Sequence, residues 1–289
     1  MNRRLWLNVG LLILVAGLAW LAYEAPGLDG REDTGLTGLS PEQVTRITIR
    51  RPGKADLVFR KEEDIWWMQS PVRVPARAFR IDSVLGIVGA QWRGRYDVAG
   101  LDLGKYGLDE PQATVFFNEV KIDFGGNEPL KQQRYVRMGD HVYLINDTLF
   151  YQLQASPAAY VSLTLLPPGN ALMAIELPGL ALVNERGRWQ ATTEGVKLAP
   201  PVMDALTQAW LHAEASQVTP FEGGSGQGEI VLRLSREPGE LRLLLLQRSP
   251  ELVVARRDIA MRFHFPAEQT RRLLPDEVVP TMADTQTPS

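Results

Sequence analysis

Residues 65–69 read IWWMQ and residues 188–192 read RWQAT, and the chain is organised around these two tryptophan-containing stretches. Each follows two short runs rich in apolar and β-branched residues, and each precedes a helical pattern that begins after proline. Short runs of this kind, bounded by turn residues, predict strands. Because Trp66 and Trp189 hold the same place in the same order of signals, the sequence indicates an internal duplication.

The first copy runs from about residue 44 to residue 154. It opens with VTRITI and LVF, and the helix after Pro75 places Ile81, Val84, Leu85 and Val88 on one face. Four strand-like runs follow, TVFF, VKIDF, RYVRM and HVYLI, and then a short apolar helix at residues 149–153.

The second copy begins near Ala171 and repeats this order, with LMAIEL and LALV before the tryptophan strand. A helix after Pro200 follows, in which Asp204 matches Asp82 of the first copy. The runs EIVLRL, LRLLLL, LVVAR and MRFHF come next, and AEQTRRLL predicts a last helix. We therefore expect an α+β fold of two similar units, residues 42–166 and 167–279, each a mostly antiparallel sheet with one or two helices.

An uncharged segment precedes these units. Residues 5–23 read LWLNVGLLILVAGLAWLAY, which as a helix spans about 28 Å, close to the thickness of a bilayer core. Arg3 and Arg4 precede the run and acidic residues follow it, so the positive-inside rule places the amino terminus in the cytoplasm. We expect a transmembrane anchor at residues 1–25, with a cleaved signal peptide as the alternative.

This reading predicts a single-pass protein of a bacterial inner membrane, with its carboxyl-terminal part in the periplasm. Residues 26–41 are rich in glycine and acids and are expected to form a tether. Residues 280–289 are polar and are expected to be a disordered tail.

Composition excludes several classes of function. The 289 residues carry a formal net charge of −3 and no long basic run, so nucleic acid is not an expected partner. The chain has no cysteine, which excludes thiol catalysis, thiolate metal sites and lipid attachment through cysteine. The hydrophobic content of 45% permits well-packed cores.

Residues able to support chemistry are sparse. His141, His212 and His264 form no pair spaced four apart, so we predict neither a metal site nor a bound cofactor. Ser225 lies in GGSGQG, which lacks the pattern of a nucleophile elbow and is expected to be a flexible loop. No catalytic residue is predicted.

The turn KYGLDEP, residues 105–111, is the other candidate. Asp102, Asp109 and Glu110 cluster around Tyr106, with Arg93 and Arg95 upstream. We expect a structural turn formed by Tyr106, Gly107, Asp109 and Pro111, in which Gly107 takes a positive φ. An arginine–aspartate lock that fixes this loop and a pair of catalytic carboxylates are the alternatives.

Large apolar side chains suggest a surface for a protein partner. Trp210 and Leu211 give their helix more apolar surface than one core-facing stripe needs, and Trp92 lies just past the first helix. These three residues are the candidate partner contacts. In the alternative, each tryptophan covers its own core.

The membrane segment, the tryptophan strand followed by a helix from Pro75 to Asp82, the turn KYGLDEP and the run RYVRMGDHVYLI (134–145) together resemble the family of domain of unknown function 4340. The resemblance covers most of residues 1–275, and YGLDEP is its most specific element. It implies a membrane-anchored envelope protein, and some relatives are associated with ABC-type transport of the gliding-motility kind. It implies no catalytic residues.

These observations favour a non-catalytic, membrane-tethered periplasmic scaffold or auxiliary protein of an envelope complex, with ABC-type transport as the candidate process. One alternative is an envelope hydrolase that uses the acids near YGLDEP. The other is a small-ligand or glycan-binding module that uses a groove between the two units.

Overall fold

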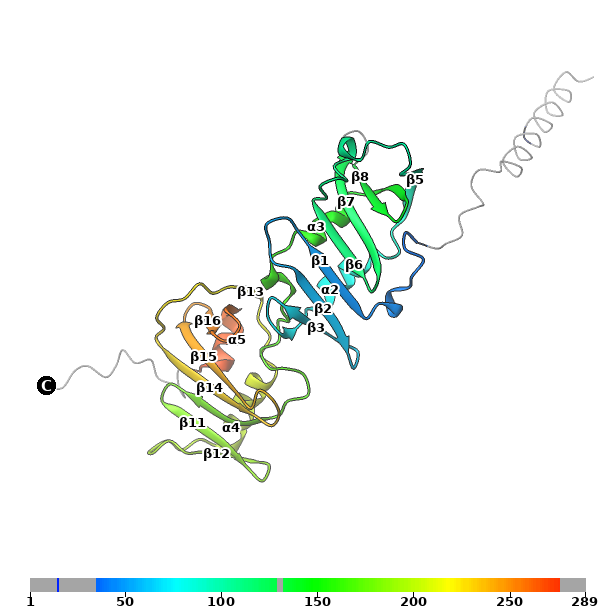
Figure 1. Cartoon of the computed structure of the whole chain (residues 1–289). Helices are drawn as coiled ribbons and strands as arrows, with labels where there is room; N and C mark the ends of the chain where they lie inside the picture. Colours follow the sequence, from blue (N-terminus) through cyan, green and yellow to red (C-terminus); the bar gives the residue numbers. More distant parts are fainter. Residues whose placement is uncertain (1–14, 16–34, 129–131, 276–289) are drawn as a thin grey trace, which may run out of the picture.

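The computed structural model describes residues 15, 35–128 and 132–275. They form two antiparallel sheets, each with its helices on one face, so the predicted α+β class is confirmed (Figure 1). The predicted anchor and the predicted tail at residues 280–289 lie outside the described residues, except for Val15. Within the described part, no helix has the length and apolarity needed to cross a membrane.

The first sheet has nine strands in the order β4-β3-β2-β1-β6-β7-β8-β9-β5. The strands are β1 (Arg46–Arg50), β2 (Leu57–Glu62), β3 (Ile65–Ser70), β4 (Val74–Pro75), β5 (Trp92–Asp97), β6 (Ala113–Phe117), β7 (Val120–Glu128), β8 (Gln133–Met138) and β9 (His141–Asn146). Its α-helices are α2 (Ala78–Leu85) and α3 (Thr148–Leu153), and three short 3-10 helices are η1 (Pro41–Gln43), η2 (Leu103–Tyr106) and η3 (Pro157–Tyr160).

The second sheet has eight strands in the order β12-β11-β10-β14-β15-β16-β17-β13. They are β10 (Leu172–Leu177), β11 (Leu180–Glu185), β12 (Arg188–Ala191), β13 (Gln217–Pro220), β14 (Gly228–Leu234), β15 (Glu240–Gln247), β16 (Leu252–Arg256) and β17 (Met261–Phe265), with helices α4 (Pro200–Leu211) and α5 (Ala267–Leu273). Apart from the two-residue β4, the strand order matches that of the first sheet. The predicted duplication is therefore present as a repeated topology.

The tryptophan strands occupy equivalent places in the two sheets. Trp66 pairs with Lys61 and Trp189 pairs with Asn184, in each case the second pair from a two-residue turn. Both residues of each turn have positive φ, 46° and 65° at residues 63–64 and 51° and 84° at residues 186–187. Positive φ at both central positions is typical of the type I′ turn that connects tightly paired strands.

The edge strands β5 and β13 are not among the predicted strands. Most of β5 and both ends of β13 are exposed, so neither sequence shows the apolar alternation that reveals a half-buried strand. Each of these strands lies at one end of its sheet, and the next strand in sequence lies near the middle. The chain therefore crosses the sheet face between them, through residues 98–112 in the first unit and 221–227 in the second.

The glycine-rich stretch around Ser225 is this second crossing. A Cβ atom at Gly226 would lie 2.4 Å from the Leu244 side chain, so the crossing backbone packs directly on β15. The sequence predicts a flexible loop here, but glycine at this position serves close packing. Gly223 and Gly224, with φ of 111° and 142°, provide the bends that lead into it.

The first unit begins earlier than predicted. Leu36 is buried, and its amide donates to the Ala90 carbonyl at 3.1 Å. The amide of Leu165 donates to the Ala213 carbonyl at 3.0 Å in the equivalent place of the second unit. Residues 35–41, predicted as part of a tether, therefore begin the first unit, because Leu36 is buried in its core and the backbone bonds to residues just after α2.

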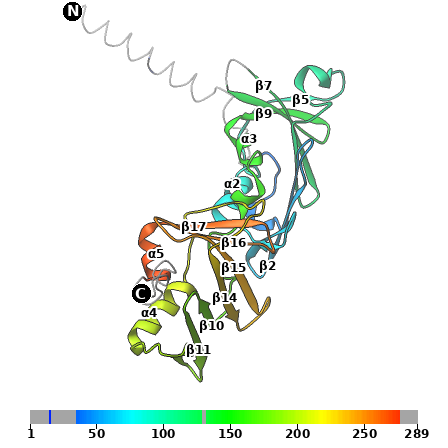
Figure 2. The same ribbon diagram turned by 90° about the vertical axis from the view of Figure 1, so that its left-hand side faces the viewer.

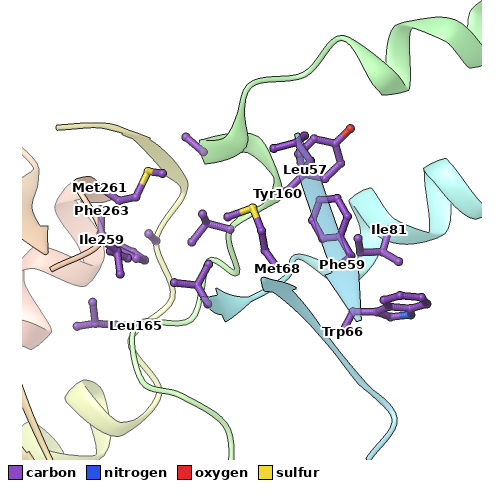
Figure 3. Packing of buried hydrophobic residues seen from close by; sticks show 14 of the residues in the cluster. Leu57, Phe59, Trp66, Met68, Ile81, Tyr160, Leu165, Ile259, Met261 and Phe263 are labelled. Carbon is purple, nitrogen blue, oxygen red and sulfur yellow. The ribbon is translucent and has the colours of Figure 1, made fainter. Parts of the chain in front are cut away.

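The segment between the units is bonded to both of them. The Ser162 amide donates to the Pro75 carbonyl at 2.9 Å, and the Ala215 amide donates to the Leu163 carbonyl at 2.8 Å. Buried side chains of the two units belong to one apolar cluster, which Figure 3 shows around this segment. The hollow between Val74 and Phe263 measures about 10 Å³, so the ligand groove predicted between the units is closed at this position.

Candidate functional site

The turn KYGLDEP packs on β7 where this strand contains glycine. Gly107 has a φ of 63°, and a Cβ atom at Gly125 would lie 2.3 Å from the Tyr106 carbonyl oxygen. The Tyr106 ring lies 4.8 Å from that of Tyr135, and Leu108 is buried. Glycine in β7 thus permits the first crossing segment to lie against the sheet, which gives this turn a structural role.

The acids of the turn face solvent. Asp102, Asp109 and Glu110 are exposed, and Asp109 accepts a hydrogen bond from the Glu110 amide at 2.9 Å. None of the hydrogen bonds or ion pairs found for the described residues joins these acids to Arg93 or Arg95. The lock suggested from those two arginines is therefore not formed.

A different arginine fixes this region. Arg134 of β8 is buried, and its Nε donates to Asp147 Oδ1 at 2.6 Å. Its Nη1 donates to Gln112 Oε1 at 2.9 Å and to the Gly125 carbonyl, and its guanidinium lies 3.6 Å from the Phe150 ring centroid. Sequence reasoning missed this residue. The available signal was a charge at an inward-facing position of the alternating run RYVRM.

The candidate partner contacts have different environments. The sequence suggests Trp210 either as a partner contact or as a cover of its own core. The structure buries Trp210 completely, as in the second alternative, and its indole donates to the Leu273 carbonyl at 3.0 Å. Trp210 therefore joins α4 to α5, because α5 packs on the side of α4 that carries this indole. Leu211 is half-buried against the core, and Trp92 is half-buried with its ring 5.4 Å from Tyr143.

The histidines are scattered. His141 opens β9, His264 lies in β17 with Nε2 at 2.9 Å from Thr219 Oγ1, and His212 caps the end of α4. In the described part of the chain, no three residues of the metal-ligating types gather closely enough to hold an ion.

An apolar hollow lies between α4 and α5, which pack side by side on one face of the second sheet (Figure 2). It measures about 650 Å³, and we call it the α4–α5 groove. Its apolar lining includes Val202, Ala205, Ala209 and Pro275. Val202 is 40% exposed, which is high for a branched apolar side chain on a helix that packs on a core.

The rim of the α4–α5 groove is polar and carries positive charge. It is formed by Gln208, His212, Gln269, Arg271 and Arg272. Arg272 pairs with Glu268 at 2.8 Å, whereas none of the ion pairs found among the described residues includes Arg271. An apolar floor beside exposed guanidinium groups can receive a ligand that has both an apolar part and a carboxylate.

A family model described as Domain of unknown function (DUF4340) matches residues 66–222, which include Trp66, the KYGLDEP turn, α4 and β13. No curated protein and no solved structure matches the chain.

Proposed function

We propose that this chain, which belongs to the DUF4340 family, is a non-catalytic, membrane-tethered scaffold that binds a protein partner of a bacterial envelope complex in its α4–α5 groove. The resemblance seen in the sequence agrees with the family match. The finer role, as an auxiliary of a complex such as an ABC-type transporter, is part of this proposal.

The α4–α5 groove is the observation that carries the proposal. Grooves between two helices are a common site for an apolar segment of another protein, and arginine is enriched at such interfaces. Val202 and Ala205 offer apolar surface without a covering element among the described residues. Apolar surface that a soluble unit leaves open in this way often marks an interaction site.

The location of the scaffold is supported by the sequence. The uncharged run at residues 5–23 and the arginines before it favour a helix that holds the two units on the periplasmic side. A carboxyl-terminal reporter that is active only in the cytosol would contradict this part of the proposal.

A small ligand is the second candidate for the same groove. Its volume of about 650 Å³ lies in the range of pockets that hold small molecules, roughly 300–1,000 Å³. A ligand that binds the native state must raise the thermal midpoint. A midpoint raised by an envelope metabolite in the wild type, but not in Ala205→Arg, would favour this candidate over protein binding.

Purification from membranes in mild detergent tests the proposal. We expect the full-length chain to retain a partner at a fixed stoichiometry and the Ala205→Arg variant to lose it, because the new cation enters an apolar site already flanked by Arg271 and Arg272. Asp204→Arg is the matched control, since Asp204 is an exposed neighbour on α4 that does not line the groove.

Two outcomes would contradict the proposal. Recovery of the wild-type chain without any other protein would show that no partner is bound. Equal recovery of a partner by both variants would place the binding surface elsewhere on the chain.

A further inference from the structure

The repeated fold provides an internal comparison for the α4–α5 groove. In the first unit, the chain that follows α3 forms η3 and packs beside the amino-terminal end of α2. The amide of Arg77, the residue that caps α2, donates to the Tyr160 carbonyl at 2.7 Å, and Tyr160 is completely buried. The first unit therefore covers this side of its helix pair with one turn of its own chain.

In the second unit, no described residue after Pro275 covers the corresponding side. By their order in the fold, α4 corresponds to α2 and α5 to α3, and Ala199 caps α4 as Arg77 caps α2. Val202 follows its cap by three residues, as Arg80 follows Arg77, so Val202 lies just past the position that η3 bonds in the first unit. The groove at Val202 thus corresponds to the place that η3 fills.

The two sites differ in charge where the helices end. In the first unit, the Tyr160 hydroxyl donates to the carbonyl of Gln152, the residue before the last residue of α3. The residue before the last residue of α5 is Arg272, and Arg271 precedes it. A ligand that lies in the second site as η3 lies in the first would therefore lie near guanidinium groups, whereas η3 meets the uncharged Gln152.

We infer that the α4–α5 groove takes one short helical turn of a partner protein, with a bulky apolar side chain over Val202 and Ala205 and a carboxylate at Arg271 and Arg272. This inference rests on the proposed function and specifies its partner. The η3 turn of the first unit indicates the shape of the ligand, and Arg271 and Arg272 indicate its charge. The chain's own residues 276–289, which include Asp276 and Glu277, are the competing occupant that the test must separate.

Fluorescence polarisation with synthetic peptides tests the inference on the full-length chain in detergent. The probe EESPAAYV joins two glutamates to the η3 sequence, and its controls are KKSPAAYV and EESPAASV. We expect the probe to bind about tenfold more tightly than either control, because each control removes one of the two matched features. We expect the Arg271→Glu, Arg272→Glu double variant to prefer KKSPAAYV.

Two outcomes would overturn the inference. Equal binding of all three peptides, or no binding, would reject the predicted ligand while leaving partner recovery from membranes intact. Tighter probe binding in the Asp276→Lys, Glu277→Lys variant than in the wild type would assign the groove to the chain's own segment. Loss of the partner from membranes, with peptide binding retained, would instead count against the proposed function.

Discussion

At the scale of single residues, Arg134 is a buried charge held by several partners. It pairs with Asp147 at 2.6 Å and stacks on Phe150, so replacing Arg134 leaves a largely buried carboxylate without its charge partner. We expect Arg134→Met to lower the free energy of unfolding by about 3 to 5 kcal/mol. Urea denaturation of the single variants and of Arg134→Met, Asp147→Asn measures this. A loss below about 1 kcal/mol for both single variants would contradict the assigned role.

Tyr160 predicts a dependence of stability on alkaline pH. Burial raises the pKa of its phenol to about 12, whereas an unfolded tyrosine ionises near pH 10. Between these values the unfolded state releases the proton and the folded state keeps it, so stability is complete below about pH 10 and falls as pH rises toward 12. We expect Tyr160→Phe to be less stable at neutral pH but to show a shallower alkaline decline. Parallel declines in the two proteins would argue against this assignment.

Residue-scale features differ in how far the sequence reveals them. The positive φ of Gly107 follows from local turn chemistry, because the neighbouring residues supply the signal. The burial of Trp210 depends on α5, whose Leu273 carbonyl lies 63 residues further along the chain. A helical pattern cannot show which second element will cover the remaining face, so the sequence left two alternatives for Trp210, a partner contact and a cover of its own core.

At the scale of elements, the contact between the KYGLDEP turn and β7 depends on one glycine. We expect Gly125→Ala to cost about 1 to 3 kcal/mol, because its Cβ atom would lie 2.3 Å from the Tyr106 carbonyl oxygen and 2.8 Å from Leu108. Gly126→Ala is the matched control, since the nearest atom would be 3.4 Å away. Thermal unfolding of the two variants measures the difference. Equal midpoints would show that the crossing segment does not depend on this close approach.

Elements with clear periodicity were predicted and those without it were not. The central strands alternate inward apolar residues with outward polar ones, as in the burial of Ala113, Val115 and Phe117. The edge strands β5 and β13 have too few buried side chains to produce this pattern, although each forms a regular antiparallel pair. These two strands are defined by their hydrogen bonds to a neighbouring strand, and a single sequence does not show which strands pair.

At the scale of the whole molecule, the connecting segment gives the two units a shared core. Leu165 is 1% exposed, so Leu165→Ala is expected to lower the free energy of unfolding by about 2 to 5 kcal/mol. Met173→Ala is the control, because Met173 is an exposed apolar residue of the second unit. Denaturation followed by tryptophan fluorescence measures both variants. Equal, small losses would indicate that the segment contributes little to the core.

The duplication was predicted from the order of sequence signals, but the junction between the copies was not. The segment around Pro167-Pro168-Gly169 reads as a break between units, which favours a groove there. The residues before it instead bond to both units: the backbone of Ser162 bonds to the first unit, and the backbones of Leu163 and Leu165 bond to the second. Such long-range pairing has no signal in the local sequence.

Site-specific photo-crosslinking in living cells tests the central claim most directly, namely that the α4–α5 groove of this scaffold binds a protein partner. A photoreactive amino acid is placed at Val202 or Gln208 in the groove and, as the comparison, at Asp82 or Gly86 on the exposed side of α2. We predict one and the same protein adduct from both groove positions and none from the α2 positions. Adducts from α2 with none from the groove, or no adduct from any position, would contradict the claim.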